Sequence, residues 1–158
     1  MKKIDGYGLK ICAFQAELFK ESLTVQNCSS KIFIRRFMYS DLAARMDANG
    51  FYYASYSITD AFDEIDRQYG HTSYGQTKYG PEEMYWMGYL YRYWTYTHEN
   101  SSKQLYHYIK PEDLSGLYYP YHSLDPSQAI ERILESRGED DDMISKGVRI
   151  MRRIRSRT

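Results

Sequence analysis

Cysteine and proline are scarce in this chain, which has two cysteines and four prolines among its 158 residues. Two cysteines, Cys12 and Cys28, are too few for a disulfide framework or a four-ligand zinc site, so we expect a cytoplasmic protein with reduced thiols. No apolar run approaches the ~20 residues of a membrane-spanning helix and no signal peptide is visible, so we expect no membrane partner. The formal net charge is also zero, because 21 basic residues balance 21 acidic ones. This neutrality excludes nucleic-acid binding by overall charge and leaves that role only to a local basic patch.

Catalytic and metal-binding signatures are missing from the sequence as well. The four histidines, His71, His98, His107 and His122, do not have the spacing of zinc motifs, so we predict no metal site. The sequence contains no nucleophile elbow, P-loop or dinucleotide-binding fingerprint. Cys12 falls on the apolar side of its expected helix, where a thiol is unreactive. We therefore expect a protein that is not an enzyme and needs no cofactor.

The apolar residues recur with helical spacing in most of the chain. This spacing predicts helices at residues 7–25, 31–40, 41–46, 82–97 and 126–136, with shorter ones starting near residues 57, 101 and 111. Residues 70–80 have three glycines and no apolar period, so we predict a loop there. The fold class that follows is all-α, a compact bundle of five to seven short helices around a central aromatic helix at about 82–97. This globular domain would comprise residues 1–137.

The last segment, residues 138–158, differs from the rest of the chain. Gly138 and an acidic run at 139–142 predict a linker, and residues 143–158 carry six positive charges beside one apolar stripe. A basic amphipathic C-terminal helix of this kind suits nucleic acid, an acidic groove on a partner, or packing against its own domain. One short stripe without an aromatic anchor is too little for stable membrane attachment. The predicted nucleic-acid or partner contacts are Arg149, Arg152, Arg153 and Arg155.

Tyrosine is the abundant residue, with 18 copies, of which eleven fall between residues 79 and 121. Because a tyrosine ring is apolar and its hydroxyl needs a partner, tyrosine favours half-wet surfaces and interfaces. The cluster is therefore either a core whose hydroxyls reach the surface or an interaction face. Arg92 is either an interface residue among these rings or a buried arginine paired with a carboxylate. The predicted partner-binding residues are Tyr85, Tyr89, Arg92, Tyr93, Tyr96, Tyr118, Tyr119, Tyr121 and His122.

Long and particular motifs occur in three segments: FIRRFMYSDLAARMD (33–47), YGQTKYGPEEMYWMGYLYRYW (74–94) and LYHYIKPEDLSGLYYPYHSLDPSQAIERILE (105–135). They resemble a small bacterial family that shares F-I-R-x-F-M-x-S-D, Y-W-x-G-Y-x-Y-R-Y-W and L-Y-Y-x-Y-H-x-x-D-P segments. The resemblance covers roughly residues 30–136. It implies an antitoxin or accessory component of a toxin–antitoxin module, with an ADP-ribosyltransferase-like toxin as the protein partner. It supplies no catalytic residues and does not reach the basic tail.

The function that these observations favour is a non-catalytic protein-binding module. In this hypothesis an antitoxin covers the active cleft of its partner with a Tyr-rich face built from residues 85–96 and 118–122. The first alternative is a nucleic-acid-associated regulator that uses the basic tail. The second is an inhibitor of another bacterial or phage defence enzyme. The sequence leaves the target and self-association open.

Overall fold

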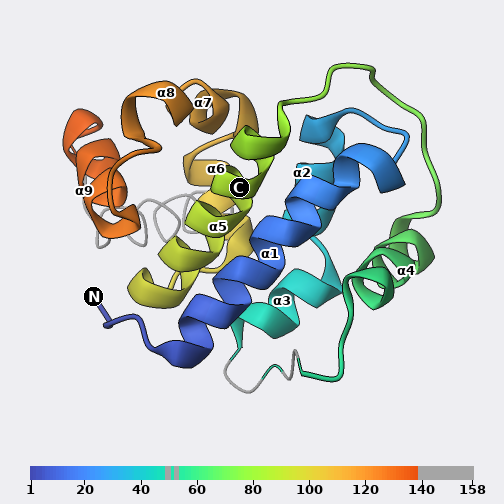
Figure 1. Cartoon of the computed structure of the whole chain (residues 1–158), viewed down its shortest axis with the longest axis horizontal. Helices are drawn as coiled ribbons and strands as arrows, with labels where there is room; N and C mark the ends of the chain where they lie inside the picture. Colours follow the sequence, from blue (N-terminus) through green and yellow to red (C-terminus); the bar gives the residue numbers. More distant parts are fainter. Residues whose placement is uncertain (49–50, 52–53, 139–158) are drawn as a thin grey trace, which may run out of the picture.

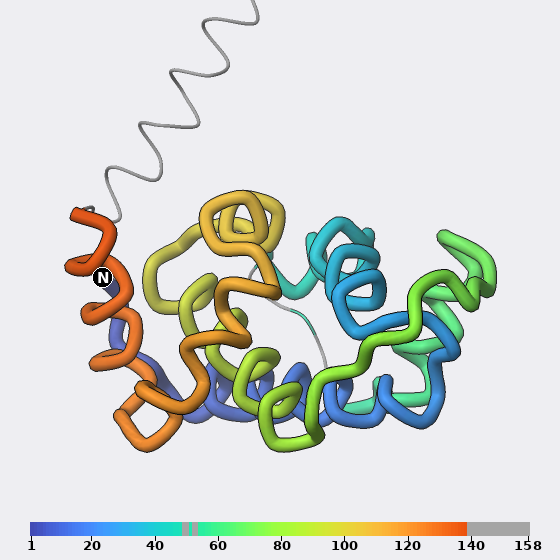
Figure 2. The backbone as a smooth tube through the Cα atoms, turned by 90° about the horizontal axis from the view of Figure 1, so that it is seen from above, coloured from blue at the N-terminus to red at the C-terminus, as the bar shows by residue number. Residues whose placement is uncertain are grey.

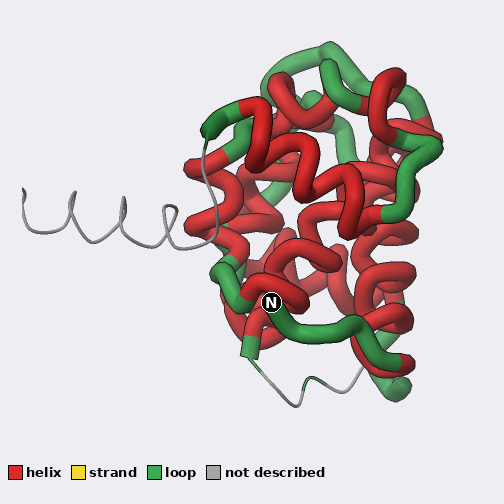
Figure 3. Tube along the Cα trace, turned by 90° about the vertical axis from the view of Figure 1, so that its left-hand side faces the viewer, coloured by secondary structure: helices red, strands yellow, loops and turns green. Residues whose placement is uncertain are grey.

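The computed structural model describes residues 1–48, 51 and 54–138, and these residues form nine α-helices and no strand. The predicted all-α fold is confirmed. The helices outnumber the five to seven expected, because two single turns, α7 (Pro111–Ser115) and α8 (Tyr118–Tyr121), count as separate helices. The sequence did not predict α8. Figure 3 shows helices through most of the described chain, joined by loops of different lengths. The predicted basic helix and its four arginines, Arg149, Arg152, Arg153 and Arg155, lie outside the described residues.

Two long helices, α1 (Gly6–Val25) and α5 (Pro81–His98), pack along each other at the centre of the molecule (Figure 1). Gly88 permits this close approach: a Cβ atom on it would lie 2.8 Å from the Gln15 carbonyl oxygen and 3.0 Å from the Ala16 Cα. Helix α5 is the predicted central aromatic helix, and Tyr91 and Trp94 on it are fully buried. It is buried on most sides because the other helices are arranged around it.

The remaining helices lie on the two sides of this pair. α2 (Ser30–Met38), α3 (Asp41–Asp47) and α4 (Ile58–Tyr69) lie on one side, and α7, α8 and α9 (Pro126–Ser136) lie on the other (Figure 1). α6 (Ser102–Tyr108) lies behind α5 in that view, beside the corner between α2 and α3 (Figure 2). One continuous core joins all of these elements.

Side-chain caps set the helix starts that the sequence predicted. The Ser40 side chain caps α3, Ser57 and Asp60 form a capping box at α4, and Ser101 and Gln104 form another at α6. In each box the two side chains satisfy backbone N–H groups that have no partner within the helix. Local sequence therefore determines where these helices begin.

Candidate partner-binding face

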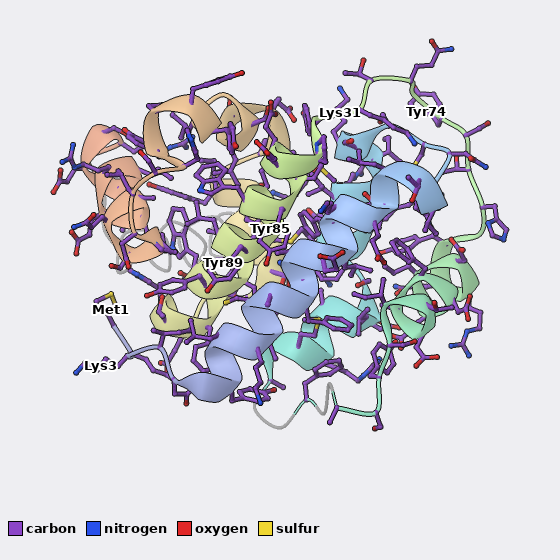
Figure 4. All side chains as sticks on the ribbon, in the orientation of Figure 1. Met1, Lys3, Lys31, Tyr74, Tyr85 and Tyr89 are labelled. Atoms are coloured by element: carbon purple, nitrogen blue, oxygen red, sulfur yellow. The ribbon has the colours of Figure 1, made fainter. Side chains whose placement is uncertain are left out.

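Three tyrosines of α5 form a row on one side of the helix. Tyr85, Tyr89 and Tyr93 are four residues apart, so their side chains project in the same direction. The ring centroids are 6.5 Å apart for Tyr85 and Tyr89 and 6.3 Å apart for Tyr89 and Tyr93, with interplanar angles of 23° and 25°. Figure 4 shows Tyr85 and Tyr89 on the near side of α5, between α1 and the helices α8 and α9. The row is exposed at its Tyr85 end, whereas Tyr93 is only 8% exposed.

The aromatic side chains of α5 are in contact with further aromatic side chains on the single turn α8. The Trp86 ring lies edge-on to the Tyr118 ring at 5.8 Å, and the Tyr118 ring stacks on the His122 ring at 4.4 Å. Tyr119 contacts Tyr118 at 5.6 Å and is 80% exposed. We call this set the aromatic face; it consists of Tyr85, Trp86, Tyr89, Tyr118, Tyr119, Tyr121 and His122. Tyr93, predicted as a partner contact, belongs instead to the buried core beneath the face, because neighbouring helices cover its ring.

The local fold of α8 explains why its tyrosines differ in exposure. The Tyr121 N–H donates to the Leu117 carbonyl at 3.1 Å and the His122 N–H donates to the Tyr118 carbonyl at 2.8 Å, which closes one helical turn. Tyr121 is half-buried against the core, whereas Tyr119 points away from it. Neighbouring residues of a helix face different directions, so anchoring Tyr121 inward leaves Tyr119 outward.

Carboxylates border the aromatic face. The Tyr118 hydroxyl donates to Glu82 Oε2 at 3.3 Å. Desolvation, and then the nearby Glu82 carboxylate, raise the pKa of Tyr118. Burial raises the pKa of Tyr89 and of Tyr93, and the Asp125 carboxylate adds to both shifts. These hydroxyls are therefore neutral at physiological pH, and the formal charge at the border is negative.

Arg92 is not part of this face, which corrects the prediction that it contacts a partner. Its side chain is 1% exposed. Nε donates to Gln15 Oε1 at 2.7 Å and Nη1 donates to Asp47 Oδ1 at 2.7 Å. Nη2 donates to the Ser102 hydroxyl at 3.2 Å. Arg92 thus joins α5 to α1, α3 and α6 as the buried arginine of the alternative interpretation.

Tyr96 also lies away from the aromatic face, at the N-terminal end of α1. Its hydroxyl donates to Asp5 Oδ1 at 2.7 Å, and Lys2 Nζ lies 3.9 Å from its ring centroid. Burial and this hydrogen bond raise the pKa of Tyr96 to about 12. The ring lines a polar cavity of about 290 Å³ together with Tyr7 and Asp47. Tyr96 therefore supports the entry of the chain into α1.

Sequence reasoning missed a second group of accessible tyrosines. Tyr39, Tyr69 and Tyr74 line one open groove with Arg35 and Arg36, although they come from separate segments of the chain. The only local signal is the pair of arginines, which the helical spacing places in solvent. Tyr39 lies beside the arginines through helical spacing, whereas only the fold brings Tyr69 and Tyr74 to them.

Two kinds of reactive group can be examined in residues 1–48, 51 and 54–138, a metal-binding cluster and the Cys12 thiol. Within this range no group of three or more His, Cys, Asp or Glu residues is arranged to hold a metal ion. Cys12 is buried, and that burial raises its pKa to about 12, so its thiol is un-ionised at neutral pH. None of the described helices is both long and apolar enough to cross a membrane. Comparison with protein-family models, curated proteins and solved structures gives no match.

Proposed function

We propose that this protein is a non-catalytic binding module that docks a partner protein on its aromatic face. The observation that carries the proposal is Tyr119, a ring that is 80% exposed beside a network of packed aromatic side chains. Tyrosine and tryptophan carry much of the binding energy at protein interfaces, because a large ring buries much area and has few rotatable bonds. Its neighbours Tyr118 and His122 are stacked on each other, so the surface around it is already ordered before binding.

The charge at the border of the face indicates the chemistry of the partner. Glu82, Glu83 and Asp125 all act electrostatically on its tyrosines. A partner surface with arginine or lysine side chains would place cations against both the rings and these carboxylates. We therefore expect a basic patch on the partner.

The motif resemblance adds the class of the partner to this proposal. An antitoxin that covers the active cleft of a bacterial toxin would act by occlusion and would need no chemistry of its own. An ADP-ribosyltransferase-like toxin is the first candidate. Inhibition of another bacterial or phage defence enzyme uses the same docking and differs only in the target. Regulation through nucleic acid bound to the tail stays a prediction, because the tail lies outside the described residues.

Capture of the partner from the native host, followed by measurement with pure components, tests the proposal. The full chain is used as bait, and any captured protein is purified and titrated against wild type and Tyr119→Ala by calorimetry. Tyr74→Ala is the matched control, because Tyr74 is 74% exposed but belongs to the other tyrosine group. We expect Tyr119→Ala to lose roughly 2 kcal/mol of binding free energy and the control to lose none. Equal affinity of wild type and Tyr119→Ala, or no inhibition of an enzymatic partner by the wild type, would contradict the proposal.

A further inference from the structure

A second surface, which we call the basic–aromatic face, is formed by α2, α6 and the loop at 70–80. An open groove of about 560 Å³ lies between α2 and this loop. α6 adjoins it: Figure 2 shows α6 beside the corner of α2 and α3, on the side of the molecule away from α1. The face consists of Lys31, Ile32, Arg35, Arg36, Tyr39, Tyr69, Thr72, Tyr74, Lys103, Tyr106, His107 and Lys110.

The tyrosines of this face lie against positively charged side chains. Lys110 Nζ is 4.7 Å from the Tyr106 ring centroid, and Lys103 Nζ is 5.9 Å from the Tyr39 ring centroid. The Tyr39 and Tyr106 rings meet edge-on at 5.4 Å, so the groups of α2 and α6 form one continuous surface. Rings and cations therefore alternate across it.

The two arginines of α2 have different roles. Arg36 Nη1 donates to the Gly70 carbonyl at 2.6 Å, and its guanidinium lies 5.4 Å from the Tyr69 ring centroid, so it braces the loop. The Arg35 side chain is exposed and makes no hydrogen bond or ion pair with the described residues. Its guanidinium is available to an anion in the groove.

Positive charge is concentrated on this face although residues 1–138 as a whole carry 15 basic and 17 acidic residues. Two carboxylates act on it, Asp41 near Tyr69 and Glu112 near Tyr106. Against them stand five Lys and Arg side chains: Lys31, Arg35, Arg36, Lys103 and Lys110. The net formal charge of the face is thus positive, which favours an anionic ligand.

Tyr74 is presented to solvent by a loop that is fixed in place. The Tyr74 carbonyl accepts the Ser29 N–H at 3.0 Å, and Lys78 Nζ donates to the Leu23 and Gln26 carbonyls at 2.8 Å. Gly75 follows with φ +80°, and a Cβ there would lie 2.7 Å from the Ser29 hydroxyl oxygen. The Tyr74 side chain makes no ring contact or hydrogen bond with the described residues. An ordered loop thus holds the Tyr74 ring in the same groove as Arg35, whose guanidinium has no hydrogen-bond partner in the described part of the chain.

We propose that the basic–aromatic face binds single-stranded nucleic acid, with a base stacked on Tyr74 and phosphates held by Arg35 and the neighbouring lysines. A nucleic-acid strand offers a flat base that stacks on tyrosine and phosphates that arginine and lysine neutralise. An acidic peptide offers the negative charge but no base. The groove is open, so a strand can pass along α2 toward α6. This site shares no residue with the aromatic face or with the predicted basic tail, and the proposal does not depend on the proposed function.

Fluorescence anisotropy with a labelled short oligouridine and the full chain tests this proposal. We expect Tyr74→Ala to weaken binding about tenfold, because it removes one base-stacking contact. Arg35→Ala should reduce the slope of log affinity against log salt by roughly 0.7, the value for one phosphate contact. Tyr119→Ala and Lys20→Ala are the matched controls, since both residues are exposed and outside this face, and both should bind like wild type. Circular dichroism of each variant checks the fold.

Three results would overturn the proposal. The first is no binding of oligouridine by the wild type at low salt. The second is weaker oligouridine binding by Arg35→Ala but not by Tyr74→Ala, together with polyglutamate competing as well as unlabelled oligouridine. This result would identify an acidic protein as the ligand. The third is weaker oligouridine binding only in the double variant Arg152→Ala, Arg153→Ala, which would assign the binding to the tail.

Discussion

The aromatic face and the basic–aromatic face use the same residue type in two electrostatic settings. On the first, two tyrosine rings stack on each other at 6.5 Å, and the Tyr118 hydroxyl donates to Glu82. On the second, the Tyr106 ring lies 4.7 Å from Lys110 Nζ. The charge of the neighbours, not the number of tyrosines, indicates which partner each face suits. On this basis we propose a basic protein surface as the partner of the first face and a nucleic-acid strand as the partner of the second.

Both faces depend on one scaffold. The row of Tyr85, Tyr89 and Tyr93 belongs to α5, and Arg92 in the same helix is bonded to the end of α3 and to α6. Substitutions in the core should therefore weaken both faces, and substitutions at the surface should affect one.

Replacing the buried arginine should have the largest effect. Arg92→Met leaves Asp47 and Gln15 without their charged partner, and breaking a buried pair in this way costs roughly 3–5 kcal/mol of unfolding free energy. Urea denaturation measures the loss. The control is Arg45→Met, which breaks a half-exposed pair with Glu64 and should cost less than about 1 kcal/mol. Similar losses in the two variants would show that Arg92 does not join the helices energetically.

Exchanging Tyr119 and Tyr74, the two most exposed tyrosines of the described residues, for alanine should separate the faces. Tyr119→Ala should lower affinity for the protein partner by roughly 2 kcal/mol and leave oligonucleotide binding unchanged. Tyr74→Ala should do the reverse. Because both side chains are largely exposed, unfolding free energies should stay within about 0.5 kcal/mol of wild type. Calorimetry and anisotropy on the same samples measure the two affinities. A variant that weakens binding of both ligands equally would show that the two faces form one site.

Adding one methyl group between the central helices should destabilise the scaffold that both faces share. In Gly88→Ala the new Cβ meets the Gln15 carbonyl oxygen at 2.8 Å and the Ala16 Cα at 3.0 Å, which are backbone atoms that cannot move aside alone. Overpacking lowers the free energy of unfolding by about 1–3 kcal/mol, whereas the higher helix propensity of alanine raises it by about 1 kcal/mol. We therefore expect a net loss of up to about 2 kcal/mol of unfolding free energy in urea denaturation. Gly80→Ala, where a Cβ meets open space, is the control, and equal stability of the two variants would contradict the close packing.

Acid should produce the smallest effect, through an ion pair outside both faces. The hydrogen bond from Arg45 to Glu64 lowers the pKa of Glu64 below its ordinary 4.5. The stabilisation by the ionised carboxylate is therefore complete above about pH 4.5 and is lost as the pH falls through the lower, folded-state value. We expect Glu64→Gln to remove less than about 1 kcal/mol at neutral pH and almost nothing in acid. Urea midpoints at the two pH values measure this, and a deficit that is as large in acid would point to packing instead of charge.

Much of the fold was predictable because its signals are local. Ser40, Ser57 and Ser101 satisfy N–H groups within three residues of themselves, so their helix starts follow from neighbouring sequence. The site was predictable only in part. Tyr119 is exposed as a binding residue must be, but Arg92 fitted two interpretations until Asp47, 45 residues away, was found beside it.

The amino-acid sequence by itself determined that the chain is helical, where most helices begin, and that tyrosine is concentrated in its second half. Only the tertiary structure decided that Arg92 lies inside, that Tyr119 lies outside, and that Tyr39, Tyr69 and Tyr74 share one groove with two arginines. The reason is the range of the interactions. Capping and periodicity act within one or two turns of a helix, whereas the direction that each side chain faces depends on helices that come from distant parts of the chain.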